Sequence, residues 1–242
     1  MNALVLNPPS KVVKNVVRDL LYACWCKGKR IGGIRFPKTS VSDPAKIYNS
    51  SNIILKAIYL RRLKICFQLI KGNSQRTLEL GTGSGILIPS LFKNSRQLIG
   101  LDIHKRLLEV KNALIDAKIT NFELIQASAY QIPVQDNVFD SIIAISLLEH
   151  LPKVERVVKE ARRVIKKNGS FIVGVPIENR ATKLRHLYLA KKYGTNANFH
   201  ITSYQDIFSA VRKYFRIVNI KKLVPFMPIA ASMYCALECR PK

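Results

Sequence analysis

The feature that most constrains this chain is a glycine-rich segment between a predicted strand and a predicted helix. Leu78–Gly85 reads Leu-Glu-Leu-Gly-Thr-Gly-Ser-Gly and follows directly from a short apolar run. Three glycines at alternate positions allow the backbone to turn sharply and to approach a ligand closely. A strand, a glycine-rich turn and a helix in this order are typical of sheets that bind a nucleotide-like ligand at the carboxyl ends of parallel strands.

The residues around and after this loop alternate between short apolar runs and amphipathic stretches of helical period. The alternation predicts parallel strands joined by helices that cover both faces of one sheet. The predicted strands are Thr77–Leu80, Gln97–Asp102, Asn121–Ile125, Asp140–Ile145 and Ser170–Val175, and the predicted helices are Ile86–Phe92, Lys105–Ala117 and Lys153–Ile165.

The C-terminal part of the chain breaks this alternation. Tyr204–Lys213 has the pattern of a helix, whereas Phe215–Val224 and Ser232–Arg240 have the pattern of strands. Only Pro225–Ala231 connects these two strands, which leaves no room for a crossover helix and predicts an antiparallel pair. The expected fold is therefore α/β: a Rossmann-like, seven-stranded sheet, mostly parallel with an antiparallel last strand, and with helices on both faces.

Two acidic residues accompany the glycine-rich loop. Glu79 lies just before the first glycine, and Asp102 ends the next apolar strand, seventeen residues after Gly85. This spacing is close to the roughly 20 residues expected for an acid that accepts hydrogen bonds from ribose hydroxyls. An acid at Glu79 suits a cationic ligand better than a diphosphate. The combination indicates a cofactor that carries both a ribose and a positive charge.

In its motifs and in their order, Thr77–Val175 resembles the class I S-adenosylmethionine-dependent methyltransferases, a broad family that includes enzymes of ubiquinone and menaquinone biosynthesis. The matching motifs are Leu78–Gly85, Gly100–Asp102, Ile132–Asp140, Ser146–Leu151 and Glu160–Ser170. The resemblance implies S-adenosyl-L-methionine as cofactor and transfer of its methyl group by in-line displacement. It implies cofactor contacts at Glu79, Gly81, Thr82, Gly83, Gly85, Asp102, Ile103, Ser128, Ala129, Tyr130 and Ser146.

One position departs from the family pattern. The family often has Asp-Ala where this chain has Ser128-Ala129, and that aspartate accepts a hydrogen bond from the adenine amino group. A serine hydroxyl is a weaker acceptor than a carboxylate. We therefore expect weaker adenine binding, with support from the neighbouring backbone or from Tyr130.

The candidate catalytic residues follow the fourth and fifth predicted strands. Glu149 and His150 lie just beyond the fourth strand, and His200 lies in the later segment Asn198–Tyr204. A histidine or a carboxylate there can act as a base toward the methyl acceptor. The alternative is that His150 only packs locally and that His200 only orders its loop. Glu178 and Asn179, after the fifth strand, are expected to line the entrance for the acceptor.

The acceptor is less constrained than the cofactor. A small-molecule or lipid-like acceptor is the first hypothesis, because the segment after the fourth strand lacks the Asn-Pro-Pro-aromatic loop of enzymes that methylate base amino groups. An RNA or protein methyltransferase and a non-catalytic module of the same fold remain as alternatives. The basic amphipathic stretch Lys183–Lys192 and the apolar loop Pro225–Ala231 could contact an anionic membrane, although a solvated helix explains the former equally well.

The chain is predicted to have two parts. Residues 1–44 form an N-terminal extension or lid, in which Leu4–Ser10 and Arg18–Arg30 resemble the start of cobalamin-binding radical S-adenosylmethionine proteins without their cobalamin or iron–sulfur motifs. Residues 45–242 form the methyltransferase domain, with an insertion near 177–203 expected to build the acceptor pocket.

The charge of the chain is strongly positive. Lys and Arg number 40 against 15 Asp and Glu, a formal net charge of +25. Such a charge attracts nucleic acid, anionic lipid or a phosphorylated substrate, although basic residues spread over a surface can also serve solvation alone. No secretory signal or apolar run of membrane-spanning length is recognisable, so a cytoplasmic protein is expected, with peripheral binding to a membrane as the alternative. The five cysteines, including Cys24 and Cys26, lack zinc-ligand spacing, so no metal site is expected.

Overall fold

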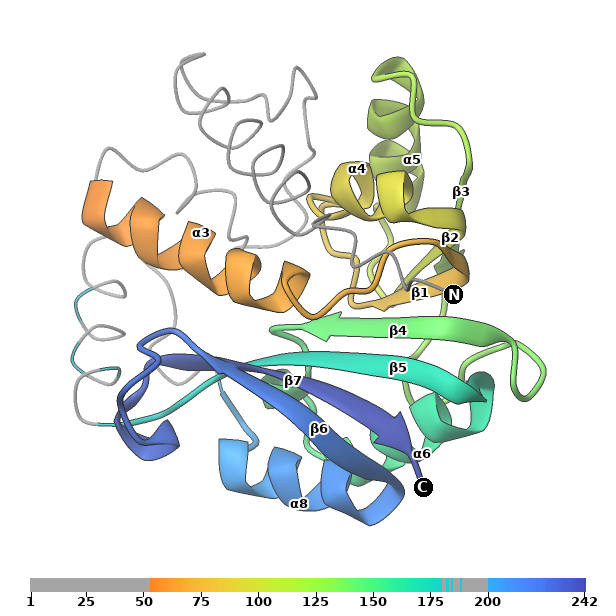
Figure 1. Ribbon diagram of the computed structural model, residues 1–242. Coiled ribbons are helices and arrows are strands. Elements are labelled where there is room, and N and C mark those ends of the chain that lie inside the picture. Colours follow the sequence, from red (N-terminus) through yellow and green to blue (C-terminus); the bar gives the residue numbers. More distant parts are fainter. Residues whose placement is uncertain (1–52, 180–181, 183, 185–187, 189–199) are drawn as a thin grey trace, which may run out of the picture.

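The computed structural model describes residues 53–179, 182, 184, 188 and 200–242 (Figure 1). The predicted extension at residues 1–44 lies outside the described residues, as does most of the basic stretch Lys183–Lys192. The helix expected between Ala45 and Lys71 is described as α3, Ile53–Phe67.

Seven strands form one sheet in the order β3-β2-β1-β4-β5-β7-β6. The strands are β1 (Ser74–Leu80), β2 (Ser95–Asp102), β3 (Phe122–Gln126), β4 (Phe139–Ile145), β5 (Ile165–Pro176), β6 (Phe215–Lys222) and β7 (Tyr234–Pro241). Strands β1 to β5 pair in parallel, whereas β7 runs antiparallel to both β5 and β6. The predicted seven-stranded sheet with an antiparallel last strand is confirmed.

The order of the strands reverses between β1 and β4. Strands β2 and β3 are added on one side of β1, and β4 and β5 are added on the other. In the register of the sheet, Leu80 of β1 lies opposite Ala144 of β4, so both strands end at the same edge. Open α/β sheets bind their ligands at such a reversal point, beyond the carboxyl ends of the strands.

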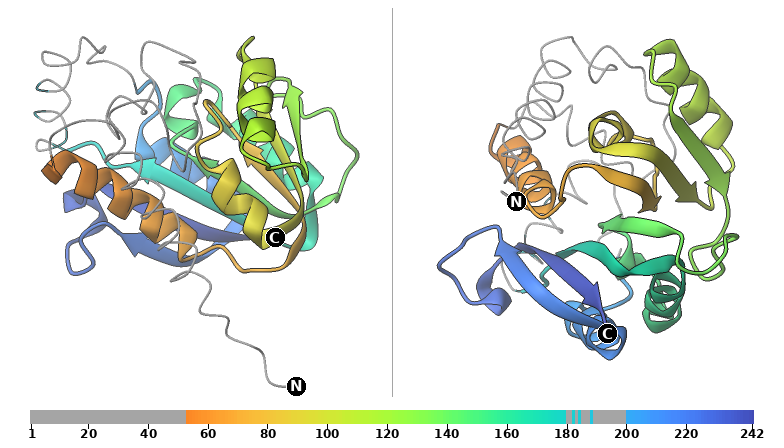
Figure 2. Two further views of the ribbon diagram at one scale, coloured as in Figure 1. Left: turned by 90° about the horizontal axis from the view of Figure 1, so that it is seen from above. Right: turned by 45° about the vertical axis from the view of Figure 1, so that its right-hand side comes forward.

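Helices cover both faces of the sheet. In Figure 1, α3, α4 (Ile88–Leu91) and α5 (Leu107–Asp116) lie above it, whereas α6 (Val154–Val164) and α8 (Tyr204–Tyr214) lie below it, and the views in Figure 2 agree. The prediction of helices on both faces is therefore confirmed.

The helix after the glycine-rich loop is shorter than predicted. The expected span was Ile86–Phe92, but α4 begins only at Ile88 and passes into a 3-10 turn at Phe92–Asn94. Pro89 lies in the first turn of α4, where its missing N–H costs no hydrogen bond. The residues before it remain in turns, which keeps the loop backbone close to the ends of the strands.

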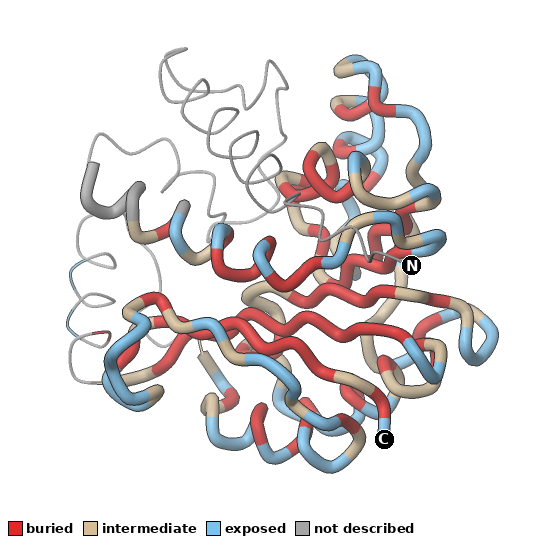
Figure 3. Tube along the Cα trace, viewed as in Figure 1, coloured by how far each residue is buried: buried red, intermediate tan, exposed pale blue. Residues whose placement is uncertain are grey.

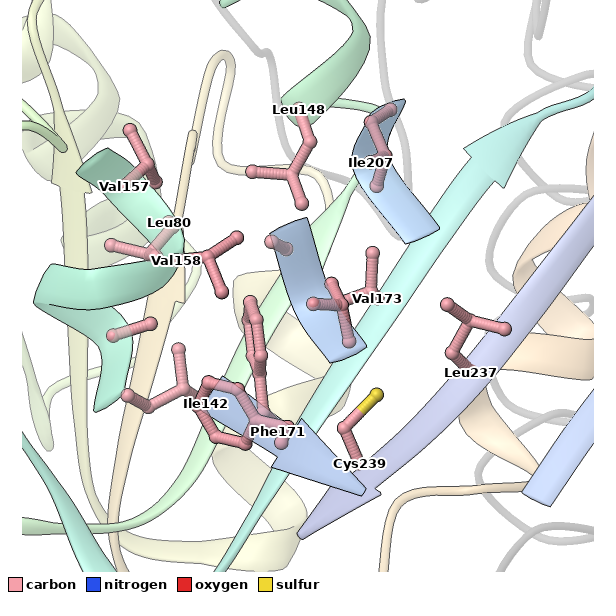
Figure 4. Packing of buried hydrophobic residues seen from close by; sticks show 14 of the residues in the cluster. Leu80, Ile142, Leu148, Val157, Val158, Phe171, Val173, Ile207, Leu237 and Cys239 are labelled. Atoms are coloured by element: carbon pink, nitrogen blue, oxygen red, sulfur yellow. The ribbon is translucent and has the colours of Figure 1, made fainter. Parts of the chain in front are cut away.

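The hydrophobic core has two halves, one on each face of the sheet. Neighbouring residues of one strand point to opposite faces, so Ile143 packs with α3 and α4 whereas Ile142 packs with α6 and α8. Figure 4 shows the second half, in which Val158 and Ile207 face Val173 and Ile142. The central strands are buried along most of their length (Figure 3), so the strand ends at the site stand on a rigid base.

Two further predictions concern cysteines and membranes. Among the described residues, Cys66, Cys235 and Cys239 are free and buried, and burial raises the pKa of the Cys66 thiol to about 12. None of the described helices is long and apolar enough to cross a membrane.

Candidate functional site

The glycine-rich loop leaves β1 in a conformation that favours glycine. Gly81, Gly83 and Gly85 have φ angles of 76°, 53° and 77°, in the left-handed region. The Gly81 N–H donates to the Leu101 carbonyl at 2.8 Å, which ties the loop to the end of β2. A Cβ atom at Gly81 would lie 2.8 Å from the Leu147 side chain, whereas one at Gly83 would meet no atom of the described residues within 4 Å, apart from its chain neighbours. The loop is thus closely packed at Gly81 and open beside Gly83.

Asp102 connects the end of β2 to this open part of the loop. Its Oδ2 accepts a hydrogen bond from the Gly83 N–H at 2.7 Å, and its Oδ1 accepts one from the His104 N–H at 3.2 Å. Each carboxylate oxygen has a further lone pair. The carboxylate is therefore fixed in place and can still accept hydrogen bonds from a ligand beside Gly83.

His104 supports the same loop, and the sequence analysis missed it. Its Nε2 lies 2.7 Å from the Gly83 carbonyl oxygen, while its Nδ1 accepts a hydrogen bond from the Arg106 N–H at 3.1 Å. The two contacts agree on the tautomer in which Nε2 carries the proton and donates it. In the sequence, only the position of His104 two residues after Asp102 pointed to its role in supporting the glycine-rich loop.

Glu79 is a buried carboxyl group directly under the loop. It is 2% exposed, and its Oε2 has no hydrogen-bond partner among the described residues. Burial, and then the charge of Asp102, raise the pKa of Glu79 well above its ordinary value. An unsatisfied buried oxygen of this kind fits a cationic or hydrogen-donating ligand that reaches the loop directly or through water.

We expect the substitution Glu79→Gln to change how stability depends on pH. Above a pH of about 4.3 the unfolded chain ionises Glu79 while the folded protein keeps it protonated, so the wild type loses stability as pH rises toward the folded pKa. Glutamine has no proton to lose, so the stability of the variant relative to the wild type should increase across this window. Urea denaturation at about pH 4.5 and about pH 7.5 measures the difference.

The exposed Glu123 of β3 provides the matched control for Glu79. Glu123→Gln should follow the wild type at both pH values, because this side chain is exposed to water in the folded protein as it is in the unfolded chain. If the curves of Glu79→Gln and the wild type were parallel, the assigned effect of burial would be wrong.

The residues predicted to hold an adenine ring lie after β2 and β3. Ile103 is 71% exposed and follows Asp102, while Ser128, Ala129 and Tyr130 are half-buried. The Ala127 N–H donates to the Asp102 carbonyl at 3.0 Å, which holds the two segments together. Ser128 Oγ accepts a weak hydrogen bond from the Tyr130 N–H at 3.3 Å, so this hydroxyl is partly used within the loop.

Because Ser128 stands where the related family often has aspartate, Ser128→Asp should tighten binding of S-adenosylmethionine. One charge-assisted hydrogen bond to an amino group adds about 1 kcal/mol or more, which corresponds to roughly five- to tenfold in Kd. Isothermal titration calorimetry measures the change, and Ser128→Asn, which lacks the charge, should give a smaller gain. Unchanged or weaker binding by Ser128→Asp would contradict the alignment of this loop.

Ser146 lies at the end of β4, beside the loop that follows β1. Its φ angle of 54° is unusual for a residue with a side chain, and its N–H donates to the Gly174 carbonyl at 2.8 Å. Ser146 Oγ lies 3.1 Å from the Tyr234 hydroxyl and accepts a hydrogen bond from the Arg62 guanidinium. The strand end is therefore held by side chains from α3 and β7.

Arg62 is a site residue that the sequence analysis missed. Its guanidinium lies over the rings of Tyr59 and Tyr234, at 4.5 and 4.2 Å from their centroids. These cation–π contacts and the hydrogen bond to Ser146 place a fixed positive charge at the reversal point of the sheet. No motif marks this arginine, which lies within an ordinary helical pattern ahead of the glycine-rich loop.

The three predicted catalytic residues lie together beyond β4. Glu149 Oε1 is 4.0 Å from His150 Nε2, and the rings of His150 and His200 have centroids 5.4 Å apart. Both the Ile201 and the Thr202 N–H donate to the Glu149 carbonyl, at 2.8 and 3.1 Å, and so bring the His200 segment to this cluster.

Glu149 and Glu178 set the electrostatics of this cluster. Glu149 is 2% exposed, and burial raises its pKa to about 7, against the opposing effect of the nearby Arg62 charge. His200 Nδ1 lies 3.0 Å from Glu178 Oε1, so Glu178 orients the imidazole instead of only lining an entrance. The cluster thus brings together a buried carboxyl group and two imidazoles, the groups that most often serve as general acids and bases.

Comparison with known proteins gives a match to the central part of the chain. Residues 78–173 match the protein family described as "Methyltransferase domain". A phosphatidylethanolamine N-methyltransferase of Cereibacter sphaeroides is 29% identical over 106 residues, which are 43% of this chain and 52% of that protein. A ubiquinone biosynthesis O-methyltransferase of Coxiella burnetii is 30% identical over 111 residues, which are 46% of this chain and 47% of that protein. The matched segments span about half the length of these relatives.

A solved structure extends the likeness of the fold. The N-methyltransferase NodS of Bradyrhizobium japonicum, in complex with S-adenosyl-L-homocysteine, superposes with a TM-score of 0.59 at 13% sequence identity. The superposition covers 95% of this chain and 98% of NodS.

Proposed function

We propose that the protein, whose residues 78–173 match the family described as "Methyltransferase domain", is an S-adenosylmethionine-dependent methyltransferase that transfers a methyl group to a small-molecule or lipid-like acceptor. The match to this family, the similarity to named methyltransferases and the shared fold of a structure that holds S-adenosyl-L-homocysteine support this family and S-adenosylmethionine as the cofactor. The acceptor, the reaction of the whole protein and the roles of individual residues are the content of the proposal.

The glycine-rich loop and Asp102 support the placement of the cofactor. A Cβ atom added at Gly83 would meet no atom of the described residues beyond its chain neighbours within 4 Å, and the nearby Asp102 carboxylate retains lone pairs for two ribose hydroxyls. When bound, S-adenosylmethionine supplies an activated methyl group on a sulfonium. Ile103, exposed beside Asp102, and the Ser128–Tyr130 segment would cover the adenine.

The observation that carries the proposal is the position of Glu149, His150 and His200 relative to the loop. Strands β1 and β4 are neighbours, so the cluster beyond β4 lies at the same sheet edge as the cofactor loop beyond β1. An in-line displacement needs an acceptor atom opposite the leaving sulfur, and the protein contributes mainly by positioning that atom and excluding water. The cluster is placed to hold an acceptor hydroxyl or amine and to take its proton.

The named relatives favour a lipid-like acceptor within this class. One is named for phosphatidylethanolamine and another for ubiquinone biosynthesis, although each matches this chain over only about half its length. The two names differ in the methylated atom, nitrogen in one and oxygen in the other. The proposal therefore covers both nucleophiles.

Methyl transfer itself is the test. The protein is incubated with S-adenosylmethionine labelled in its methyl group and with lipid, small-molecule, protein and RNA fractions of a cell extract. We expect label in the lipid or small-molecule fraction, and none with Asp102→Ala. Label in RNA or protein would support the alternative that the protein is an RNA or protein methyltransferase. Cofactor binding without transfer to any fraction would support the alternative of a non-catalytic module.

We also propose that the protein contacts an anionic membrane through the face between α3 and the β6 edge. A groove of about 730 Å³ on this face has four basic side chains at its wall. Its lining comprises Arg61, Lys64, Ile65, Gln68, Ile220, Lys221, Lys222 and Pro225. Phe226, in the adjoining loop, is 86% exposed. Basic side chains around an exposed aromatic ring suit a surface of anionic headgroups.

The double substitution Lys221→Glu/Lys222→Glu should weaken sedimentation with vesicles containing anionic lipid by more than tenfold. Each lysine near such a surface contributes about 1 kcal/mol, and the reversed charges add repulsion. Lys111→Glu/Lys118→Glu makes the same change in net charge at two exposed lysines, one on α5 and one just after its C-terminal end, and serves as control. Equal weakening by both pairs would mean that net charge, and not this face, drives the binding.

A further inference from the structure

The acceptor-side cluster also has the composition of a metal site. Glu149, His150 and His200 each offer one ligand atom, and these atoms all lie within 4.8 Å of one another. A metal held at about 2.1 Å by nitrogen and oxygen ligands needs separations of about 3.3 Å, so modest side-chain rotation closes the set. We propose that these three residues bind a divalent first-row transition-metal ion. The sequence analysis, which considered the spacing of the cysteines, expected no metal site.

Glu149 gives the first independent support. Its side chain is almost completely buried, with 3% of its surface exposed, and its Oε2 has no hydrogen-bond partner among the described residues. A buried carboxylate oxygen without a donor is costly, and it usually marks a missing ligand, ion or water. The carboxyl group belongs to the same cluster as the two imidazoles, so a cation there would satisfy it.

His200 and Glu178 give the second support. The contact of 3.0 Å between His200 Nδ1 and Glu178 Oε1 fixes the tautomer in which Nδ1 donates its proton and Nε2 presents a lone pair. Histidine ligands of metals almost always donate their other ring N–H to a carboxylate or a carbonyl in this way. Glu178 therefore acts as the group that orients a metal ligand.

The donor set selects the class of metal. Two imidazoles and one carboxylate favour Mn²⁺, Fe²⁺, Co²⁺ or Zn²⁺, whereas Mg²⁺ and Ca²⁺ prefer oxygen ligands throughout. Three protein ligands leave coordination positions open, as in catalytic sites. Resting on the proposed function, the inference adds that an acceptor hydroxyl occupies an open position, where the metal orients it and promotes loss of its proton to solvent, while the three side chains act as ligands and not as the base.

Cobalt is the probe that tests metal binding. Apo-protein is titrated with Co²⁺ in the presence of a phosphine reductant, and binding is followed by visible absorption and by calorimetry. We expect one Co²⁺ per chain, with d–d bands of nitrogen and oxygen ligands and no thiolate charge-transfer band. Glu149→Gln and His200→Gln should each weaken binding by at least tenfold, and Glu178→Gln by about 10- to 100-fold, as other orienting partners of metal ligands do.

Glu123→Gln is the matched control, because Glu123 is an exposed carboxyl group on β3 and not part of this cluster. Its Co²⁺ affinity should equal that of the wild type. S-adenosylmethionine binding measured on Glu149→Gln and His200→Gln verifies that the variants are folded. An absence of Co²⁺ binding, a thiolate spectrum, or unchanged affinity in the folded cluster variants would overturn the proposed site.

Metal binding and methyl transfer are tested by separate measurements, so one proposal can be contradicted while the other stands. Co²⁺ affinity is measured without any acceptor, so a failure to find methyl transfer leaves that result standing. Conversely, full methyl transfer by protein freed of metal with a chelator would overturn the role of the metal and leave the transferase function intact. Loss of transfer on chelation, with recovery on adding Co²⁺ or Mn²⁺, is the result we expect.

Discussion

Asp102→Ala is expected to weaken binding of S-adenosylmethionine by at least about 100-fold. A carboxylate that accepts from two ribose hydroxyls makes two charge-assisted hydrogen bonds, each contributing roughly 1.5–3 kcal/mol. Their loss corresponds to about 10²- to 10⁴-fold in Kd. The substitution also releases the Gly83 N–H, which Asp102 holds at 2.7 Å, so the loop loses part of its fixed conformation.

Calorimetric titration with S-adenosylmethionine measures this effect. Asp116→Ala, at the exposed C-terminal end of α5, is the matched control and should bind as the wild type does. Circular dichroism of Asp102→Ala should retain the wild-type spectrum, because the strand itself is held by β1 and β3. A Kd for folded Asp102→Ala within threefold of the wild-type value would mean that the ribose does not lie at β2.

The second large effect is expected at the acceptor side. Glu149→Gln and His200→Gln should each lower kcat for methyl transfer by about 10²- to 10⁴-fold, the range for losing a positioned acid–base group. The Kd for S-adenosylmethionine should remain close to the wild-type value, because these side chains lie beyond β4 and not at the glycine-rich loop. This split between turnover and cofactor affinity separates an acceptor-side role from general damage to the site.

The control for this pair is Glu123→Gln, an exposed carboxyl change on β3 that should leave kcat unaltered. Steady-state rates at saturating cofactor and acceptor give kcat, and single-turnover experiments give the rate constant of the chemical step. If Glu149→Gln and His200→Gln retained wild-type rates, the cluster would be structural, as in the alternative in which His150 only packs locally and His200 only orders its loop.

The sheet and the cofactor side of the site follow from local patterns. The predicted strand Asp140–Ile145, for example, contains the continuous apolar run Ile142–Ile145, a composition typical of buried parallel strands. Gly83 and Asp102 are separated by a single strand–helix–strand unit, so their spacing along the chain predicts their contact in space. The predicted α4 was too long because the apolar residues of Ile86–Phe92 have a helical period even where the chain forms turns before Pro89.

The acceptor side depends on contacts between distant parts of the chain. Arg62 stacks on Tyr234 and binds Ser146, and the three residues come from α3, β7 and the end of β4. No periodicity or motif links them, because their contact arises only when the helix packs across the sheet. Glu149 and His200 were predicted separately as bases. Their mutual approach, and that of Glu178, required the three-dimensional arrangement.

The most direct test of the account is a crystal structure of the protein with S-adenosyl-L-homocysteine. We expect both ribose hydroxyls of the ligand to lie within about 3 Å of the Asp102 carboxylate oxygens. We also expect ligand atoms in the space beside Gly83 and the sulfur on the side of Glu149 and His200. A ligand bound elsewhere, or a ribose without contact to Asp102, would contradict the account.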